Sequence, residues 1–242
     1  MITEHIEYVN NSENSGAHKT MGWFLGKILL EILDLGSFFI MALGIVLCIR
    51  FFIFSPFSVV GISMEPTFQS NDFVIIDKVS SQKMKIEERL SQETWSTLRS
   101  LAEWAVHILP ELQRGDVVVF VPPGKDIHYI KRVVGLPGET VKILPDNQVQ
   151  ICKTNTSECF ILDQSYLPKD YKTLPICGTS EFIVEKWLFV MGDNREHSTD
   201  SRCCFTIGCF GENVEGVKPY IVPFNYIIGK VRARVVPNYT RF

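Results

Sequence analysis

The hydrophobic residues near the amino terminus form one uninterrupted run rather than a periodic pattern. Between Asp34 and Glu65 the only charged residue is Arg50. Residues 35–55 supply the roughly 20 apolar positions that a helix needs to cross a hydrocarbon core. Pro56 is expected to end this helix. The run therefore predicts a transmembrane helix over residues 35–55, and this interpretation is favoured over a cleaved signal or a buried core helix.

A polar stripe precedes this run. Lys27, Glu31 and Asp34 are spaced i, i+4 and i+7 on an otherwise apolar segment from Met21 to Leu33, as in a helix that lies in the membrane interface. Residues 1–34 are accordingly predicted to be a cytoplasmic or interfacial segment. Basic residues occur on both sides of the span, so charge alone leaves its orientation open.

After Pro56 the pattern changes to short runs of Val, Ile and Phe bounded by turn residues, which is typical of strands. Turn signals such as Pro137-Gly138 separate these runs. The fold class predicted for residues 56–242 is mainly β, in one extracytoplasmic domain. The predicted strands are Phe73 to Ile76, Asp116 to Val121, His128 to Val134, Thr140 to Leu144, Gln148 to Ile151, Leu188 to Met191, and Tyr226 to Val236.

Two segments depart from the strand pattern. Met84 to Leu112 carries apolar residues at mixed three-and-four spacing, which predicts an amphipathic helix that packs on the β core or rests on a membrane surface. The stretch from about 145 to 186 is more polar. It is predicted to be a small inserted β excursion from the main sheet.

Composition narrows the possible functions. The 242 residues carry a net charge of −3 without a basic cluster, which argues against nucleic-acid binding. Of the seven cysteines, Cys48 lies in the apolar run, and the other six could be bridged outside the cytoplasm or be ordinary thiols. The five histidines show no metal-ligand spacing, so no metal and no cofactor are expected.

One candidate nucleophile follows the apolar run directly. Ser63 lies within Gly61-Ile62-Ser63-Met64-Glu65-Pro66-Thr67, where glycine and proline allow a tight turn that exposes the hydroxyl. Such a loop is weak support for a nucleophile when it stands alone.

A candidate base lies in the predicted strand that begins at His128. Lys131 shares a strand face with Tyr129 and Val133, and Arg132 points to the opposite face. Burial would lower the pKa of Lys131, and a neutral amine can take a proton from a serine hydroxyl. The alternative is a lysine that reaches solvent from a strand edge.

A third polar pattern, Gly192-Asp193-Asn194-Arg195-Glu196-His197-Ser198-Thr199-Asp200-Ser201-Arg202, is typical of a hydrogen-bonded loop. Together, SMEPT, YIKRVVGLPGE and GDNR-x-x-S-x-DSR, in this order behind a single span, closely resemble the type I signal peptidase family. The resemblance runs from about Arg50 through Arg202. It implies a signal-peptidase-like β-rich catalytic domain on the outer face of the membrane, with the amino terminus inside.

The resemblance also implies roles for single residues. Ser63 matches the nucleophile, Lys131 the general base, and Ser198 the serine that helps to orient the lysine. Ile62, Met64 and Tyr129 are expected to contact the substrate. The residues expected to brace the site are Arg132, Asp193, Asp200 and Arg202.

The chain departs from the family pattern at two places. The backbone N–H of Ser63 is expected to donate to the oxyanion, and Gly61 stands where some members have a serine that supplies a second donor, so a backbone group or water would take that place. After Arg202, the segment Cys203 to Cys209 replaces the usual aromatic residue and glycine.

The expected function is removal of signal peptides from exported preproteins. The enzyme would be a single-pass protein of a bacterial-type plasma membrane, and its partners would be signal peptides, the lipid bilayer and a nearby export translocon. Two alternatives are a related Ser-Lys peptidase that matures one dedicated secreted substrate and a non-catalytic membrane-tethered binding domain.

Overall fold

The computed structural model describes residues 10–92, 106, 109–122, 125–154, 156, 158–203, 220–236 and 240–241. The chain divides into two compact units, residues 1–51 and 52–242. The first unit is built on one long helix, and the second carries the strands. The predicted fold class, mainly β with an apolar helix at the amino terminus, is confirmed.

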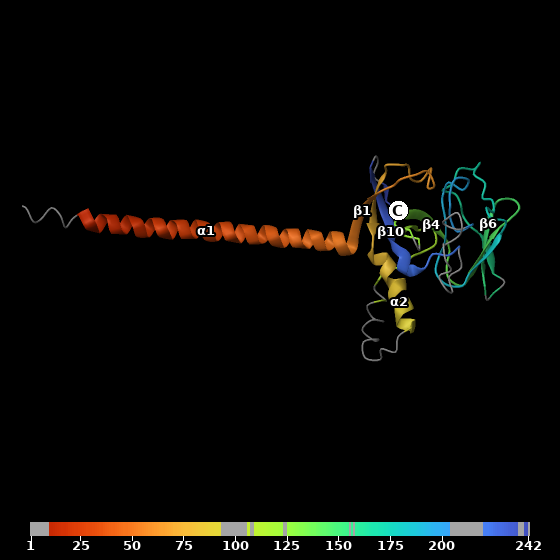
Figure 1. Ribbon diagram of the computed structural model, residues 1–242, viewed down its shortest axis with the longest axis horizontal. Helices are drawn as coiled ribbons and strands as arrows, with labels where there is room; N and C mark the ends of the chain where they lie inside the picture. Colours follow the sequence, from red (N-terminus) through yellow and green to blue (C-terminus); the bar gives the residue numbers. More distant parts are fainter. Residues whose placement is uncertain are drawn as a thin grey trace, which may run out of the picture. The chain divides into compact units, whose positions relative to one another are not determined.

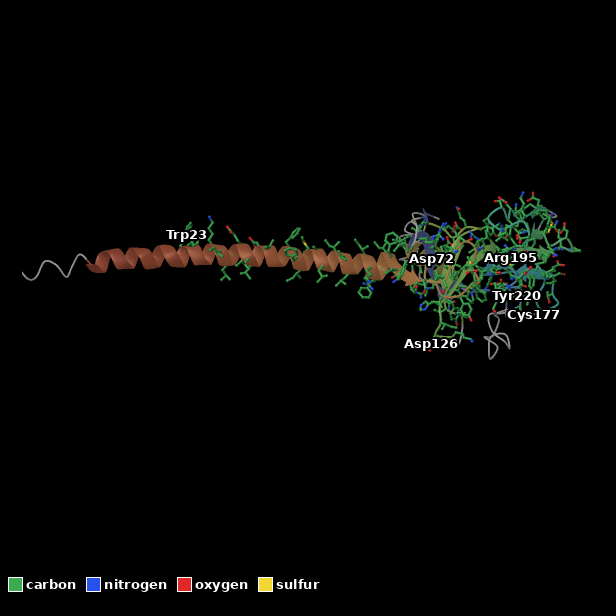
Figure 2. All side chains as sticks on the ribbon, turned by 90° about the horizontal axis from the view of Figure 1, so that it is seen from above. Trp23, Asp72, Asp126, Cys177, Arg195 and Tyr220 are labelled. Carbon is green, nitrogen blue, oxygen red and sulfur yellow. A yellow bond between two sulfur atoms is a disulfide. The ribbon has the colours of Figure 1, made fainter. Side chains whose placement is uncertain are left out.

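The amino-terminal helix α1 runs from Asn10 to Cys48, and a π-helical turn continues it from Ile49 to Ile53. The segment Gly26–Ile53 has a mean hydropathy of 2.5 and none of it is buried, so it is long and apolar enough to cross a membrane. The side chains of this helix project outward, and Trp23, which lies just before the segment, is labelled in Figure 2. The predicted interfacial segment Met21 to Leu33 belongs to this same continuous helix.

The end of this helix differs from the prediction. The helical run ends at Ile53 and strand β1 (Phe54–Ser58) begins at the next residue, so Pro56 lies inside a strand rather than at a helix end. A proline is tolerated there because β1 is an edge strand of its sheet.

The second unit contains two antiparallel sheets. The larger has seven strands, β1, β2 (Phe73–Asp77), β10 (Ile227–Val236), β3 (Val117–Phe120), β4 (Tyr129–Gly135) and β9 (Phe189–Met191) in that spatial order, with β11 (Thr240–Arg241) paired to β10. The smaller has β7 (Cys159–Ile161), β6 (Val149–Lys153), β5 (Glu139–Ile143) and β8 (Glu181–Val184). Figure 1 shows β1, β10 and β4 in one layer and β6 in the other. The smaller sheet begins at Glu139, whereas the predicted excursion began near residue 145.

Every predicted strand has a counterpart, but the predicted long helix does not extend as far as expected. Helix α2 covers Gln82–Gln92, after a short 3-10 turn at Val79–Ser81. Residues 93–105 lie outside the described residues. The predicted end at Leu112 is wrong, because Leu109 to Leu112 is not helical and Pro110 cannot continue a helix. Another 3-10 turn, Phe224–Tyr226, precedes β10.

Three apolar clusters hold this unit together. The cluster that matters most for the site lies between β2, β3 and β10 and includes Met64 and Phe68, which are 1% and 0% exposed. These two side chains anchor the loop of residues 59–72, which joins β1 to β2. A loop with two buried apolar anchors holds its remaining polar residues in fixed positions.

Candidate active site

The loop that carries Ser63 is closed at its base by backbone hydrogen bonds. The Val59 amide donates to the Asp72 carbonyl at 2.8 Å, and the Asn71 amide donates back to Val59 at 2.8 Å. Gly61 adopts a φ of +100°, which a residue with a side chain rarely adopts. The loop thereby turns sharply just before the serine and leaves Ser63 half-buried.

Lys131 faces Ser63 from the centre of β4. The Lys131 Nζ donates to the Ser63 Oγ at 2.7 Å and to the carbonyl of Ile130 at 2.9 Å. The lysine is 2% exposed. Burial lowers its pKa to about 8, and the negative charges of Asp200 and Asp193 limit the decrease. A serine hydroxyl hydrogen-bonded to such an amine is the pairing that nucleophilic catalysis requires.

Arg132, the next residue of β4, points to the other face and is held by a carboxylate. Its Nε and Nη2 donate to the two oxygens of Asp193 at 2.8 and 2.6 Å. Thr67, from the serine loop, donates to the same carboxylate at 2.5 Å. Burial opposes the charge on Arg132, but the bonds with Asp193 outweigh it and raise the arginine pKa. Asp193 therefore ties β4 to the loop that carries Ser63.

Most of the polar loop from Gly192 to Arg202 is buried, as its hydrogen bonds allow, whereas Glu196, His197 and Thr199 are exposed. Asp200 binds Arg202 through both oxygens at 2.9 Å and also accepts the Gly192 amide at 2.9 Å. Burial alone would raise the pKa of Asp200, but its attraction to Arg202 and these bonds lower it. The loop is thus folded around an internal ion pair.

The Gly192–Arg202 loop also binds the backbone of the loop that carries Ser63. The Asn194 amide donates to the Ser63 carbonyl at 3.1 Å, and its side-chain Nδ2 donates to the Ile62 carbonyl at 3.1 Å. At Gly192, an added Cβ would lie 2.1 Å from the Ser198 Oγ and 2.5 Å from the Ser63 carbonyl oxygen. Only glycine fits at position 192, because the two loops meet there.

The structure brings most of the predicted site residues together. Ser198 is buried against Gly192, but its hydroxyl has no hydrogen-bond partner among the described residues, so the expected bond to Lys131 is not formed. Gly61 is exposed and its amide donates to the Ser70 Oγ at 3.4 Å.

The residues predicted to contact the substrate near Ser63 and Lys131 differ widely in solvent exposure. Ile62 is 50% exposed, Met64 is buried, and the ring of Tyr129 lies 5.6 Å from the Lys131 Nζ. Ile62 and Tyr129 can therefore meet a ligand directly, whereas Met64 supports the loop from below.

Three polar residues were missed as functional candidates although they lie inside the quoted motifs. Thr67 and Asn194 bind other site residues, and Arg195, labelled in Figure 2, is 1% exposed and donates to the Gly192 carbonyl. The sequence signal that could have found them is the high density of polar residues in these motifs. The pattern predicted a hydrogen-bonded loop, without a separate role for these three residues.

Comparison with known proteins identifies the family. The family described as signal peptidase, peptidase S26, matches residues 32–236. The signal peptidase I of Bacillus licheniformis is 30% identical over 167 residues, which cover 67% of this chain and 74% of that protein. Signal peptidase I T of Bacillus subtilis is 30% identical over 199 residues, which cover 80% and 86%. A solved signal peptidase I from Enterococcus faecalis matches 49% of this chain and 95% of its own at 24% identity, with a TM-score of 0.31.

The fold is mainly β, and the family match defines the class of protein as a peptidase. The chain belongs to the signal peptidase family, peptidase S26, and is thus a serine peptidase.

Proposed function

We propose that this protein is a membrane-anchored signal peptidase that removes signal peptides from exported preproteins with Ser63 as nucleophile and Lys131 as general base. The observation that carries the proposal is the 2.7 Å hydrogen bond between the Lys131 Nζ and the Ser63 Oγ, made by a lysine that is 2% exposed. With a pKa of about 8, a useful fraction of this amine is neutral near physiological pH.

The reaction would proceed through an acyl-enzyme. Neutral Lys131 takes the proton of the Ser63 hydroxyl while the Oγ attacks the scissile carbonyl carbon, and the lysine then gives that proton to the departing amine. A water molecule, deprotonated by the same amine, attacks the ester and frees Ser63. Each half of the cycle returns Lys131 to its neutral form.

Fixed donors would hold the oxyanion. The Ser63 N–H donates to none of the described residues, which leaves it available to a substrate oxygen. Ser198 would assist Lys131: its buried hydroxyl has no hydrogen-bond partner among the described residues and would be available to the amine during the reaction. Arg132, Asp193, Asp200 and Arg202 would keep both loops in register.

The substrate would bind as an added strand. β1 is an end strand of the described sheet and pairs with β2, and an extended peptide would add on its other side. Ile62 and Tyr129 would contact this added strand, and the buried Met64 would support the loop beneath it.

The apolar helix would anchor the catalytic unit at the outer face of a bacterial-type plasma membrane, near the export translocon. The span Gly26–Ile53 supports the anchor. Two disulfides, Cys152–Cys159 and Cys177–Cys203, support an oxidising compartment for the catalytic unit. An anchor restricts the enzyme to the surface at which its substrates emerge and raises their effective concentration.

The test is cleavage of a purified preprotein in detergent by the wild type, Ser63→Ala and Lys131→Ala, with sequencing of the new amino terminus. Cleavage after small residues by the wild type alone is the expected result. Lys142→Ala, a change to a half-exposed lysine of β5, serves as the control and should cleave normally. Equal behaviour of all four proteins would favour a tethered binding domain, and cleavage of one substrate only would favour a dedicated maturation peptidase.

A further inference from the structure

Residues 163–177, between β7 and β8, form an irregular segment, here called the strap. A segment without helix or strand depends on side-chain contacts for its conformation, because its backbone groups have no ladder to join. The contacts of the strap converge on the Gly192–Arg202 loop, although the strap contains none of the motif residues.

Arg195 makes the first connection. It is 1% exposed, and its guanidinium donates to the Thr173 Oγ1 at 2.6 Å, to the Tyr166 hydroxyl at 2.9 Å and to the side-chain oxygen of Gln164. Its Nε donates to the Gly192 carbonyl at 3.1 Å. Arg195 forms no salt bridge with a described residue, so these neutral groups of the strap solvate a buried cation.

Tyr166 and Leu174 make the second connection. The ring of Tyr166 lies 4.2 Å from the guanidinium carbon of Arg132, the residue that binds Asp193. The Arg202 Nη1 donates to the carbonyl of Leu174 at 3.2 Å. The strap thus touches both ion pairs of the site, one through an aromatic ring and the other through a backbone oxygen.

A covalent bond closes the arrangement. Cys177, at the end of the strap, is disulfide-bonded to Cys203, which directly follows Arg202. Figure 2 shows Cys177 at the periphery and Arg195 in the interior. The disulfide therefore fixes the carboxyl-terminal end of the Gly192–Arg202 loop from outside, while Arg195 fixes its beginning from within.

We propose that the strap, fastened by the Cys177–Cys203 disulfide, is a positioning element for the peptidase reaction, which keeps Asp193, Asn194 and Ser198 in place around Ser63. The inference rests on the proposed function and adds to it a dependence of turnover on one particular disulfide. The Cys152–Cys159 disulfide joins the neighbouring strands β6 and β7 and has no contact of this kind with the loop.

Loss of the Cys177–Cys203 bond has a defined physical consequence. A loosened strap admits water to Arg195 and then to the Gly192–Arg202 loop, and the Asn194 bonds that hold the Ser63 carbonyl lose their support. Misplacement of a catalytic group by about 1 Å can lower turnover by about 100-fold. Water near Lys131 also removes part of the desolvation that keeps this amine neutral.

The experiment compares the full-length wild type with C177S/C203S and with the matched control C152S/C159S, each purified in detergent. Initial rates of preprotein cleavage are measured over substrate concentration and from about pH 6 to about pH 10, to separate kcat, KM and the acid limb of the pH profile. C177S/C203S is expected to lose at least about tenfold in kcat with KM within about threefold, because positioning is impaired and binding is not. Its acid limb should move to higher pH, whereas C152S/C159S should match the wild type.

Equal kcat and an unchanged acid limb in C177S/C203S would overturn the inference. Equal losses in both double variants would also overturn it, because the dependence would then be general. Failure of the proposed function has a different signature, namely a wild type that does not cleave or a Ser63→Ala variant that cleaves as well as the wild type.

A second pair of variants decides the matter if C177S/C203S does not fold. Tyr166→Phe removes the hydroxyl that binds Arg195 but keeps the ring beside Arg132, and Tyr171→Phe changes another tyrosine of the strap without such a bond. Tyr166→Phe should lower kcat and shift the acid limb upward, and Tyr171→Phe should do neither. The same activity and pH profile for both variants would exclude a positioning role for the strap.

Discussion

On the two faces of β4, the pKa values of two adjacent cations are shifted in opposite directions. Arg132 is bound by both oxygens of Asp193, and its pKa is raised. Among the described residues Lys131 donates hydrogen bonds to a hydroxyl and a carbonyl and to no carboxylate, and its pKa is lowered to about 8. Both side chains are buried. Burial therefore does not set the direction of the pKa shift by itself, because a carboxylate in contact can outweigh the cost of desolvation.

The same comparison separates two kinds of work. The Arg132 face holds structure, since its ion pair joins β4 to the Gly192–Arg202 loop and to Thr67. The Lys131 face carries the reactive group in the proposed mechanism, since a base must be able to lose its proton near the working pH. The following predictions change one face at a time.

The largest effect is expected for Lys131→Arg. A guanidinium stays protonated, so the base would be lost while the positive charge remains. Cleavage of a preprotein should fall by at least about 10³-fold. Rates from purified protein check this, with Lys142→Arg on β5 as the control. Substantial activity in Lys131→Arg would show that the lysine acts only as a cation.

Asp193→Asn tests the other face. It leaves Arg132 buried without a carboxylate, and loss of one partner of a buried pair costs about 3–5 kcal/mol. The midpoint of denaturant unfolding should fall accordingly. The matched control is Glu158→Gln, which breaks the exposed pair with Lys153 and should not change the midpoint. Equal midpoints for the two variants would mean that Arg132 finds another partner.

The pH dependence of the wild type follows from the lowered pKa of Lys131. The reactive form is the neutral amine, so kcat/KM should decrease about tenfold for each pH unit below a pKa of about 8 and level off above it. A rate profile in buffers of constant ionic strength measures this. An acid limb close to pH 10.5 would mean that the lysine is solvated in solution.

The smallest expected effect is a gain in the free energy of unfolding when Lys131 is replaced, whereas the preceding variants lose activity or stability. The pKa of Lys131 in the folded protein lies below its ordinary value of 10.5, so folding is disfavoured as pH falls from above 10.5 through about 8, and the penalty is constant below that. Lys131→Met should abolish cleavage yet raise the free energy of unfolding at pH 7 by about 1–3 kcal/mol. The gain should shrink above pH 10.5. Denaturant melts at both pH values test this, and a variant less stable at pH 7 would contradict it.

The strands were predictable from sequence where apolar runs end at turn residues. The strand missed at the start of the sheet, β1, follows the membrane run without a break, and Pro56 favoured a helix end over an edge strand. β7 and β8 were missed because each is a short run in a polar region. The end of the long helix could not be placed because apolar spacing continues past Pro110 without marking the backbone change.

The site was predictable as far as motifs and strand alternation reach. The opposite directions of Lys131 and Arg132 follow from the two-residue period of β4. Contacts between segments distant in sequence were not predictable. The hydrogen bonds of Arg195 with the strap join residues about 20 to 30 positions apart, and the type of a polar residue does not identify its partner. The role of Ser198 stays a prediction, since its hydroxyl has no hydrogen-bond partner among the described residues.

Gly192 limits which changes the active site can undergo. Even one methyl group at this position would meet the Ser198 hydroxyl and the Ser63 carbonyl, so the 19 alternatives are closed whatever their chemistry. Variation that alters substrate preference must therefore enter through exposed positions such as Ile62. A library that randomises both positions should return functional clones with many residues at 62 and glycine alone at 192.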